Sequence, residues 1–308
     1  MFHPAELVQW YETRSNLRIS RPPAPSAFWP LFMARGAPLT GVPESLESAA
    51  SGPTDLLIVL TTYDRARLCE RKLESLPELI RRAGRLEHVH LLVLCDASSD
   101  DYGPARMLAQ RLFGSAVTWL DAHTHLGKAN YWKTYQTAFL AAKRLQPIHT
   151  LFLQDDVQYE ADLLRDAYAL WDNTESDPNR RLIYLFSTDD DEAQGRWIRF
   201  VRDELPALGL RLTQWFDLQS YLVDRAFFEQ LDYRMVPVHP NRWRRKAQLS
   251  SGVGAQLTRR LFGRANLYQA WPALVVHGAH QSKMNPGARA VRSLDNLALL
   301  HTGFDAIC

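Results

Sequence analysis

Short apolar runs alternate with segments of helical periodicity through the first half of the sequence, and this alternation limits the fold more than any other feature. Residues 56–60 read Leu-Leu-Ile-Val-Leu, and similar strand-forming runs occur at 89–94, 116–120 and 150–153. Between them, the residue pattern indicates helices at 66–83, 104–113 and 131–145. Strands that alternate with helices form a parallel sheet joined by right-handed crossovers. The sequence therefore predicts an α/β fold, with helices flanking a mostly parallel sheet.

Composition excludes several classes of protein. The 308 residues are 46% hydrophobic and 23% charged, with a formal net charge of +2, which is ordinary for a globular protein and too near neutral to indicate nucleic acid or membrane binding. The three cysteines have no metal-binding spacing, and no apolar run is long enough to span a membrane. We therefore expect a soluble protein of the reducing cytoplasm, with peripheral membrane association left open.

Polar side chains follow three of the expected strands, at 61–65, 96–101 and 154–156. The carboxyl ends of parallel strands meet at one edge of the sheet, where open α/β folds bind ligands. Asp155 and Asp156 would offer this edge the oxygen ligands that Mg²⁺ and Mn²⁺ prefer. The alternative is that the pair caps the helix that follows. Together with the Gly127-Lys128 turn, the three loops indicate a nucleotide and metal site.

The second half carries further candidates on its own strands and helices. We expect a helix at 163–171, a strand at 182–186, one or two strands within 210–223, a helix at 255–262 and a strand that ends near residue 277. His277 closes this last strand, so it could be a third ligand of the same metal or a structural histidine.

Two aspartates and one basic cluster suggest catalytic and anion-binding roles. Asp217 lies in an aromatic run, where a carboxylate must be paired or have a raised pKa, and either condition suits a general base as well as a structural role. Asp191 is the last of three consecutive aspartates, which either bind a second cation or form an exposed acidic loop. Arg244 lies in the basic segment 242–246, which is a solvated surface, a lid over pyrophosphate or a binding position for an anionic acceptor.

The order of these pieces resembles the glycosyltransferases of the GT-A fold, the nucleotide-sugar enzymes typified by glycosyltransferase family 2. Asp96, Ser98 and Asp100 resemble an Asp-x-Ser-x-Asp element whose first Asp meets the base, and 154–156 lies where the family has its Asp-x-Asp motif. Residues 272–277 resemble the late strand whose His completes the metal site. The stretch 128–156 is also similar to N-acetylglucosaminyltransferase IV, where a Lys-x-Asn helix leads to a strand that ends Glu-Asp-Asp.

The resemblance implies an enzyme, a metal-dependent hexosyltransferase-type glycosyltransferase that moves a sugar from a nucleotide-sugar donor, with a UDP-sugar favoured, to a hydroxyl acceptor. Asp156 and His277, helped by Asp155, would hold Mn²⁺ or Mg²⁺. Asp217 is the first candidate for the catalytic base and Asp191 the second. The residues expected to contact the donor are Thr61, Tyr63, Arg65, Asp96, Ser98, Lys128, Asp155 and Arg244.

Two departures from the family pattern keep other readings open. Gln154 replaces the first acid of the motif, and the Glu-Asp pair that supplies the base of inverting relatives is absent before residue 256. The base must come from elsewhere, or the enzyme is retaining. The alternatives are a nucleotidyltransferase, although residues 61–65 lack the glycine-rich loop common there, and a catalytically inactive sugar-nucleotide or polymer-binding protein.

The expected organisation is one domain preceded by an arm. Seven prolines between residues 21 and 53 exclude a long helix there, so we expect 1–53 to form an N-terminal arm. Residues 54–160 would form the nucleotide-sugar-binding half and 161–308 the acceptor-binding and metal-completing half of the same domain. The acceptor is left open among a glycan, a glycolipid and another hydroxyl compound, with nucleic acid the least favoured.

Overall fold

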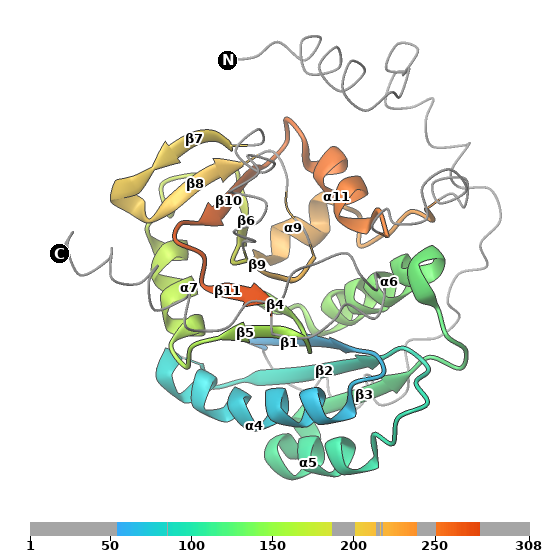
Figure 1. Cartoon of the computed structure of the whole chain (residues 1–308). Coiled ribbons are helices and arrows are strands. Elements are labelled where there is room, and N and C mark those ends of the chain that lie inside the picture. The colour runs from blue at the N-terminus through green and yellow to red at the C-terminus, as the bar shows by residue number, and fades with distance from the viewer. Residues whose placement is uncertain are drawn as a thin grey trace. The chain divides into compact units, whose positions relative to one another are not determined.

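A computed structural model describes residues 54–84, 86–186, 201–213, 216, 218–238 and 251–277 (Figure 1). The first half contains, in chain order, β1 (Leu56–Thr62), α4 (Ala66–Ala83), β2 (Val89–Cys95), α5 (Gly103–Phe113), the 3₁₀ helix η1 (Gly114–Ala116), β3 (Val117–Asp121), α6 (Gly127–Leu145) and β4 (His149–Gln154). All the strands and helices expected in this half are present. The largest difference is that α6 begins at Gly127, four residues earlier than expected.

The second half is more irregular. It contains β5 (Val157–Tyr159), α7 (Leu163–Asp172), β6 (Arg180–Tyr184), β7 (Val201–Leu205), the 3₁₀ helix η3 (Pro206–Leu208), β8 (Leu210–Thr213), β9 (Ser220–Asp224), α9 (Arg225–Gln230), α11 (Val253–Leu261), β10 (Asn266–Ala270) and β11 (Val275–His277). The segment 210–223 thus supplies two strands. None of the helices within the described residues is long and apolar enough to cross a membrane.

Nine of the strands form one mixed sheet in the order β3-β2-β1-β4-β9-β6-β10-β8-β7. The strands β3, β2, β1 and β4 are mutually parallel, as expected from the alternation of strands and helices. β9 runs antiparallel to both of its neighbours, β4 and β6, and β8 runs antiparallel to β10 and β7. The remaining strands share one direction, since β10 is parallel to β6. The sheet is therefore mostly parallel, with two reversed strands in its second half.

The strand order places a topological switch point between β1 and β4. From β1 the chain crosses through α4 to β2 and through α5 to β3, then returns through α6 to β4 on the other side of β1. Right-handed crossovers in opposite directions put α4 and α5 on one face of the sheet and α6 on the other (Figure 1). α4 packs against α5 and α7, and α6 packs against α9. Ligands bind at such a point, beyond the carboxyl ends of the strands.

The core explains why the central strands are continuous apolar runs. β1 lies between β2 and β4 with helices over both faces, and all seven of its residues are buried. Phe152 of β4 is fully packed, with its ring stacked 5.6 Å from Tyr135 of α6 and 4.5 Å from Tyr221 of β9, between ring centroids. This stack joins the parallel half of the sheet to the inserted antiparallel strand.

A second, two-stranded sheet lies directly after β4. β5 pairs antiparallel with β11, and His277 is opposite Val157 in the register. Asp155 and Asp156 form the turn between β4 and β5. The capping alternative for this pair is therefore wrong, because α7 begins only at Leu163 and is preceded by Asp162.

We predict that Phe152→Ala lowers the free energy of unfolding by about 3–5 kcal/mol, because it removes a buried aromatic side chain and leaves a cavity. Urea denaturation followed by circular dichroism measures this change. Met107→Ala on α5 is the control, since Met107 is 69% exposed and its truncation should change stability by less than about 0.5 kcal/mol. A loss below about 1 kcal/mol at Phe152 would contradict the packing described here.

Candidate functional site

The loop after β1 and the turn after β4 meet at the switch point and are joined through Asp155. The Asp155 backbone N–H donates to the Thr61 carbonyl at 3.1 Å, which extends the β1–β4 ladder by one bond. The Asp155 carboxylate accepts a hydrogen bond from the Thr62 hydroxyl at 2.7 Å and one from the Tyr63 N–H at 3.4 Å. Asp155 therefore connects the two strand ends as expected, and most of its hydrogen-bonding capacity is used by the protein.

Arg65 lies between the two carboxylates of the acid pair, Asp155 and Asp156. Its Nη1 atom is 3.2 Å from Asp155 Oδ1 and 2.7 Å from Asp156 Oδ2, and the three side chains are 11%, 4% and 10% exposed. Burial and the neighbouring Asp156 raise the pKa of Asp155 despite the opposing charge of Arg65. Within the described residues, the buried Oδ1 of Asp156 has no hydrogen-bond partner. The pair thus keeps one carboxylate oxygen without a partner.

Tyr102, which sequence reasoning missed, links Arg65 to Asp155 through a relay of hydroxyl groups. The Arg65 backbone N–H donates to the Tyr102 hydroxyl at 3.0 Å, and that hydroxyl lies 2.8 Å from Thr62 Oγ1. Because the single Thr62 proton is donated to Asp155, the Tyr102 hydroxyl must donate to Thr62. Burial raises the pKa of Tyr102, so this proton stays on the oxygen. The relay fixes the loop that carries Arg65.

Lys72 of α4 is a second positive charge near the acid pair that sequence reasoning missed. Its ammonium nitrogen lies 4.2 Å from the centre of the Tyr159 ring, in a cation–π contact on β5. Burial lowers the pKa of Lys72 to about 8, although the charges of Asp155 and Asp156 oppose this shift. The signal in the sequence is its position, since Lys72 falls within the apolar stripe of α4 beside Leu73.

Asp96, at the end of β2, is held against the start of α6. One carboxylate oxygen accepts the Leu126 N–H at 2.6 Å, and the other accepts the Gly127 N–H at 3.1 Å. The second oxygen also lies 3.0 Å from His125 Nδ1. The His125 ring stacks on Tyr63, with 4.3 Å between centroids and 19° between planes. The Asp96 carboxylate and the Tyr63 ring therefore face a common position, which His125 fills.

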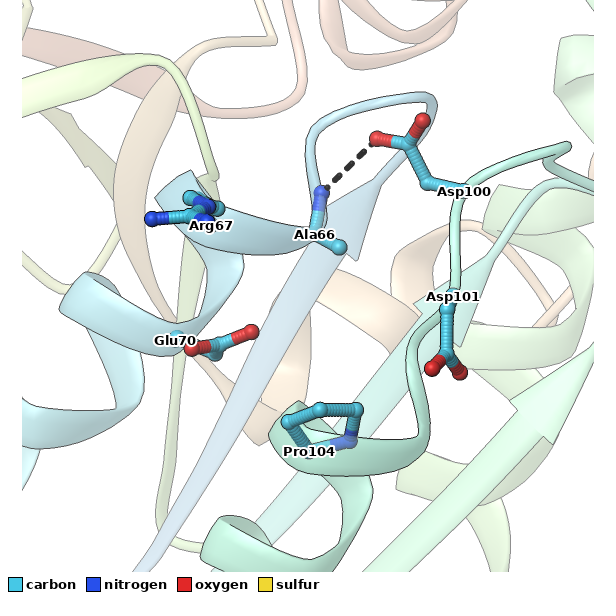
Figure 2. A pocket seen from close by; sticks show the side chains of 6 residues that line it. All are labelled: Ala66, Arg67, Glu70, Asp100, Asp101 and Pro104. Carbon is cyan, nitrogen blue, oxygen red and sulfur yellow. Dashed lines mark hydrogen bonds between the residues drawn. The ribbon is translucent and has the colours of Figure 1, made fainter.

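Ser98 and Asp100 tie the β2 loop to the β1 loop. The Ser98 hydroxyl donates to Asp64 at 2.7 Å, and Asp100 accepts the Ala66 N–H at 3.2 Å in the first turn of α4 (Figure 2). A pocket of about 550 Å³ opens beside this contact, and its lining residues are Ala66, Arg67, Glu70, Asp100, Asp101 and Pro104. The structure therefore places Ser98 at the predicted edge of the sheet, where its hydrogen bond connects the loop after β2 to the loop after β1. Its contact with a donor stays a prediction.

The predicted metal ligands come from neighbouring strands. His277 pairs with Val157, the residue after Asp156, and its ring lies 4.8 Å from the Phe186 ring in an edge-on contact. No group of three or more His, Cys, Asp or Glu side chains that could hold a metal occurs among the described residues. The pairing register thus places His277 on the strand next to the acid turn, and the metal site stays a prediction.

Lys128 also lies at this edge, as the second residue of α6, where burial lowers the pKa of its ammonium. The other predicted functional residues, Asp191, Asp217 and Arg244, lie outside the described residues, as does the N-terminal arm. Leu218, the neighbour of Asp217, is buried, and its carbonyl accepts hydrogen bonds from the Tyr135 hydroxyl at 3.1 Å and from Gln154 Nε2 at 3.4 Å. Leu218 therefore lies beside the residue that precedes the acid pair.

Comparisons with known proteins give matches only among solved structures. No family model matches the sequence, and no curated protein sequence matches it. The chain is similar to a mannosyltransferase from Pyrobaculum calidifontis, solved in complex with GDP-Man and Mn²⁺, with a TM-score of 0.51 and 16% identity over 76% of this chain and 60% of that one. S. aureus TarS, residues 1–349, gives a TM-score of 0.45 and 14% identity over 71% of this chain and 60% of that one.

A third match is glucosyl-3-phosphoglycerate synthase from Mycobacterium tuberculosis, in complex with Mn²⁺, UDP and glucosyl-3-phosphoglycerate. It gives a TM-score of 0.44 and 16% identity over 89% of this chain and 85% of that one. The chain spans about 60% of the length of the first two solved chains. At these identities the match to the mannosyltransferase shows the fold alone, and the likeness to N-acetylglucosaminyltransferase IV stays a prediction. The expected α/β architecture is confirmed: the chain has the GT-A fold.

Proposed function

We propose that the protein is a metal-dependent glycosyltransferase that moves a sugar from a nucleoside-diphosphate donor to a hydroxyl acceptor. The observation that carries this proposal is the meeting of the acid pair with the Asp96 loop at the β1–β4 switch point. This is the edge of an α/β sheet at which ligands bind. A glycan, a glycolipid or another hydroxyl compound is the proposed acceptor, and nucleic acid is less favoured because the net charge is only +2.

The chemistry of Asp96 selects among nucleobases. A carboxylate oxygen accepts hydrogen bonds, so Asp96 favours a base that presents a ring N–H to it over a base that presents a ring acceptor at the same position. Uracil and guanine have such a group, whereas neutral cytosine and adenine present an acceptor at the corresponding position. Tyr63 offers a flat aromatic face beside Asp96, on which a base can stack. A UDP-sugar is our first choice of donor and a GDP-sugar the second, with Thr61 and Ser98 beside the ribose.

The residues at the acid pair fit a divalent cation. Asp156 has a buried carboxylate oxygen without a partner among the described residues, and His277 lies on the adjoining strand. Two protein ligands suffice for Mg²⁺ or Mn²⁺, because such ions also bind water and the phosphates of the substrate. The cation would neutralise the charge that develops on the leaving diphosphate. Asp155 would contribute mainly its charge, since Thr62, Tyr63 and Arg65 already bind its oxygens.

Arg65 acts as the counter-ion of the acid pair when no other cation is present. A divalent ion at Asp156 would bring a second positive charge to the same two carboxylates. The ion pairs that Arg65 makes with Asp155 and Asp156 would then weaken. We propose that Arg65 then turns its guanidinium to the diphosphate, whose geometry matches a guanidinium fork. Lys128 and Arg244 would add further positive charge at that position.

The acceptor hydroxyl needs a base, and Asp217 is the proposed one, with Asp191 as the second candidate. The support for Asp217 is the position of its neighbour Leu218, whose carbonyl lies within hydrogen-bond distance of Gln154. General-base assistance of this kind contributes about 10² to 10⁴-fold in rate.

We predict that UDP or GDP with Mn²⁺ raises the thermal midpoint of the protein, while CDP and ADP do not. A ligand present at ~100 Kd stabilises the native state by about 2.7 kcal/mol, which a thermal-shift assay detects. The shift should be lost with EDTA and in Asp156→Asn. It should persist in Asp203→Asn, which alters an exposed carboxylate on β7.

A shift with CDP or ADP alone would contradict the role of Asp96, and no shift with any nucleotide would contradict the proposed function. Slow hydrolysis of the stabilising sugar nucleotide, measured with and without Mn²⁺, separates an active transferase from an inactive sugar-nucleotide-binding protein.

We predict that Asp217→Asn lowers kcat by about 10² to 10⁴-fold and leaves the affinity for the donor nucleotide unchanged, because it removes only the proton acceptor. Steady-state kinetics and calorimetric titration of the nucleotide measure the two quantities. Equal losses in turnover and nucleotide affinity would assign Asp217 a structural role.

We predict that Arg65→Met destabilises the metal-free protein by about 3 kcal/mol near pH 8 and by less than about 1 kcal/mol near pH 5. The folded-state pKa of Asp155 is raised, so ionisation of this group costs stability, and the cost grows as the pH rises through that pKa. Removal of Arg65 increases this cost only where the Asp155 carboxylate is ionised. Urea denaturation at both pH values tests this, with Arg67→Met, an exposed arginine two residues later, as the control. An equal loss at both pH values would refute the counter-ion role.

A further inference from the structure

We infer that His125 occupies the position of the donor's nucleobase when no donor is bound and leaves it when the donor binds. The inference rests on the proposed function, because it assumes that Asp96 and Tyr63 receive a base. It goes further in naming the group that competes with the donor for this position.

His125 makes the two contacts that a bound base would make. Its ring lies nearly parallel to the Tyr63 ring, with centroids 4.3 Å apart. Its Nδ1 atom lies 3.0 Å from Asp96 Oδ2, and with a proton on that nitrogen the ring donates a hydrogen bond to the carboxylate. A uracil ring would likewise present a flat face to Tyr63 and an N–H group to Asp96. The imidazole and the base therefore require the same face and the same acceptor.

Two further acceptor positions of Asp96 are used by the backbone of the same chain. The backbone N–H groups of Leu126 and Gly127 take one position on each carboxylate oxygen, at 2.6 and 3.1 Å. These bonds hold the carboxylate in place at the start of α6, where the helix dipole also favours a negative charge. The contact with His125 is the one that involves a side chain, so it can be exchanged without moving the helix.

The backbone conformation at Gly127 leaves room for the His125 ring. Gly127 has φ +55°, and a Cβ atom there would lie 3.2 Å from His125 Nε2. A side chain at residue 127 would therefore be strained and would press on the imidazole. The His125 side chain is nevertheless 48% exposed, against 11% for Asp96. One stack and one hydrogen bond at a half-exposed position make a contact that a ligand can displace.

Displacement has a measurable consequence for affinity. If His125 leaves the base-binding position free in only a fraction of molecules, the apparent affinity for a nucleotide is reduced by that fraction. Removal of the imidazole deletes one aromatic pair and one hydrogen bond, so the base-binding position would be free in a larger fraction of molecules. We therefore expect His125→Ala to bind UDP or GDP about five-fold more tightly than the unaltered chain.

The experiment is calorimetric titration of UDP and of GDP, with Mn²⁺, into the full chain, His125→Ala and His123→Ala. His123 is an exposed histidine two residues earlier and serves as the matched control. His125→Gln is the second variant, since it keeps an N–H donor but lacks the ring, and its affinity should lie between the other two. Circular dichroism and thermal melts establish that each variant is folded. In the unaltered chain, nuclear magnetic resonance of the ten histidine rings should show the His125 signal move on addition of UDP or GDP.

Tighter binding in His125→Ala, with no change in His123→Ala, supports the inference. Equal affinity, or an imidazole signal that does not move, overturns it and leaves the proposed function intact. Weaker binding in His125→Ala also overturns it, because His125 would then contact the nucleotide directly. Absence of nucleotide binding in every variant refutes the proposed function itself, and this inference with it.

Discussion

The structure of the site depends on one guanidinium group placed between two buried carboxylates. Asp155 and Asp156 are adjacent in the chain and almost inaccessible to water, so each loses hydration and repels the other. Such charges are tolerated only when they are paired and hydrogen-bonded. Arg65 supplies the pairing from the neighbouring loop, and Thr62 and Tyr102 supply the hydrogen bonds that hold the loop there. Thus the acid pair and the loop after β1 stabilise each other.

The same physical logic applies at Asp96, a short distance along the same edge of the sheet. Its carboxylate is satisfied by two backbone N–H groups and by His125. At both positions the chain satisfies a carboxylate with its own donor groups. The donor side chain is the long Arg65 at the acid pair and the half-exposed His125 at Asp96, and either can move. A binding site needs such mobile partners if its charges are to remain paired both before and after the ligand binds.

The sequence predicted the parallel half of the fold because the information there is local. The apolar run at 56–60 is buried as expected. So are Leu73, Leu76 and Leu79, which lie at helical spacing in α4. The start of α6 was predicted too late, since Gly127 and Asn130 read as a turn although they lie in the helix. The insertion of β9 between β4 and β6 and the pairing of β5 with β11 depend on contacts between distant segments, which periodicity cannot reveal. The same holds for Arg65, because nothing near it in the chain indicates that it binds residues 155 and 156. Asp217 and Asp191 were identified by residue type and by their neighbours in the sequence, and their position in space is still a prediction.

The small β5–β11 sheet has a consequence for the order in which the protein assembles. The strands β1 to β4 are joined by local crossovers and can pair as soon as the first half of the chain exists. β5 follows at once, but its partner β11 is the last strand of the described chain. Closing so long a loop is entropically costly and slow, so this pairing belongs to the final stage of folding. During synthesis on the ribosome, β1 to β4 can therefore pair, and Arg65 can bind the acid pair, well before β11 closes the small sheet. His277 is thus the last of the described site residues to reach its place.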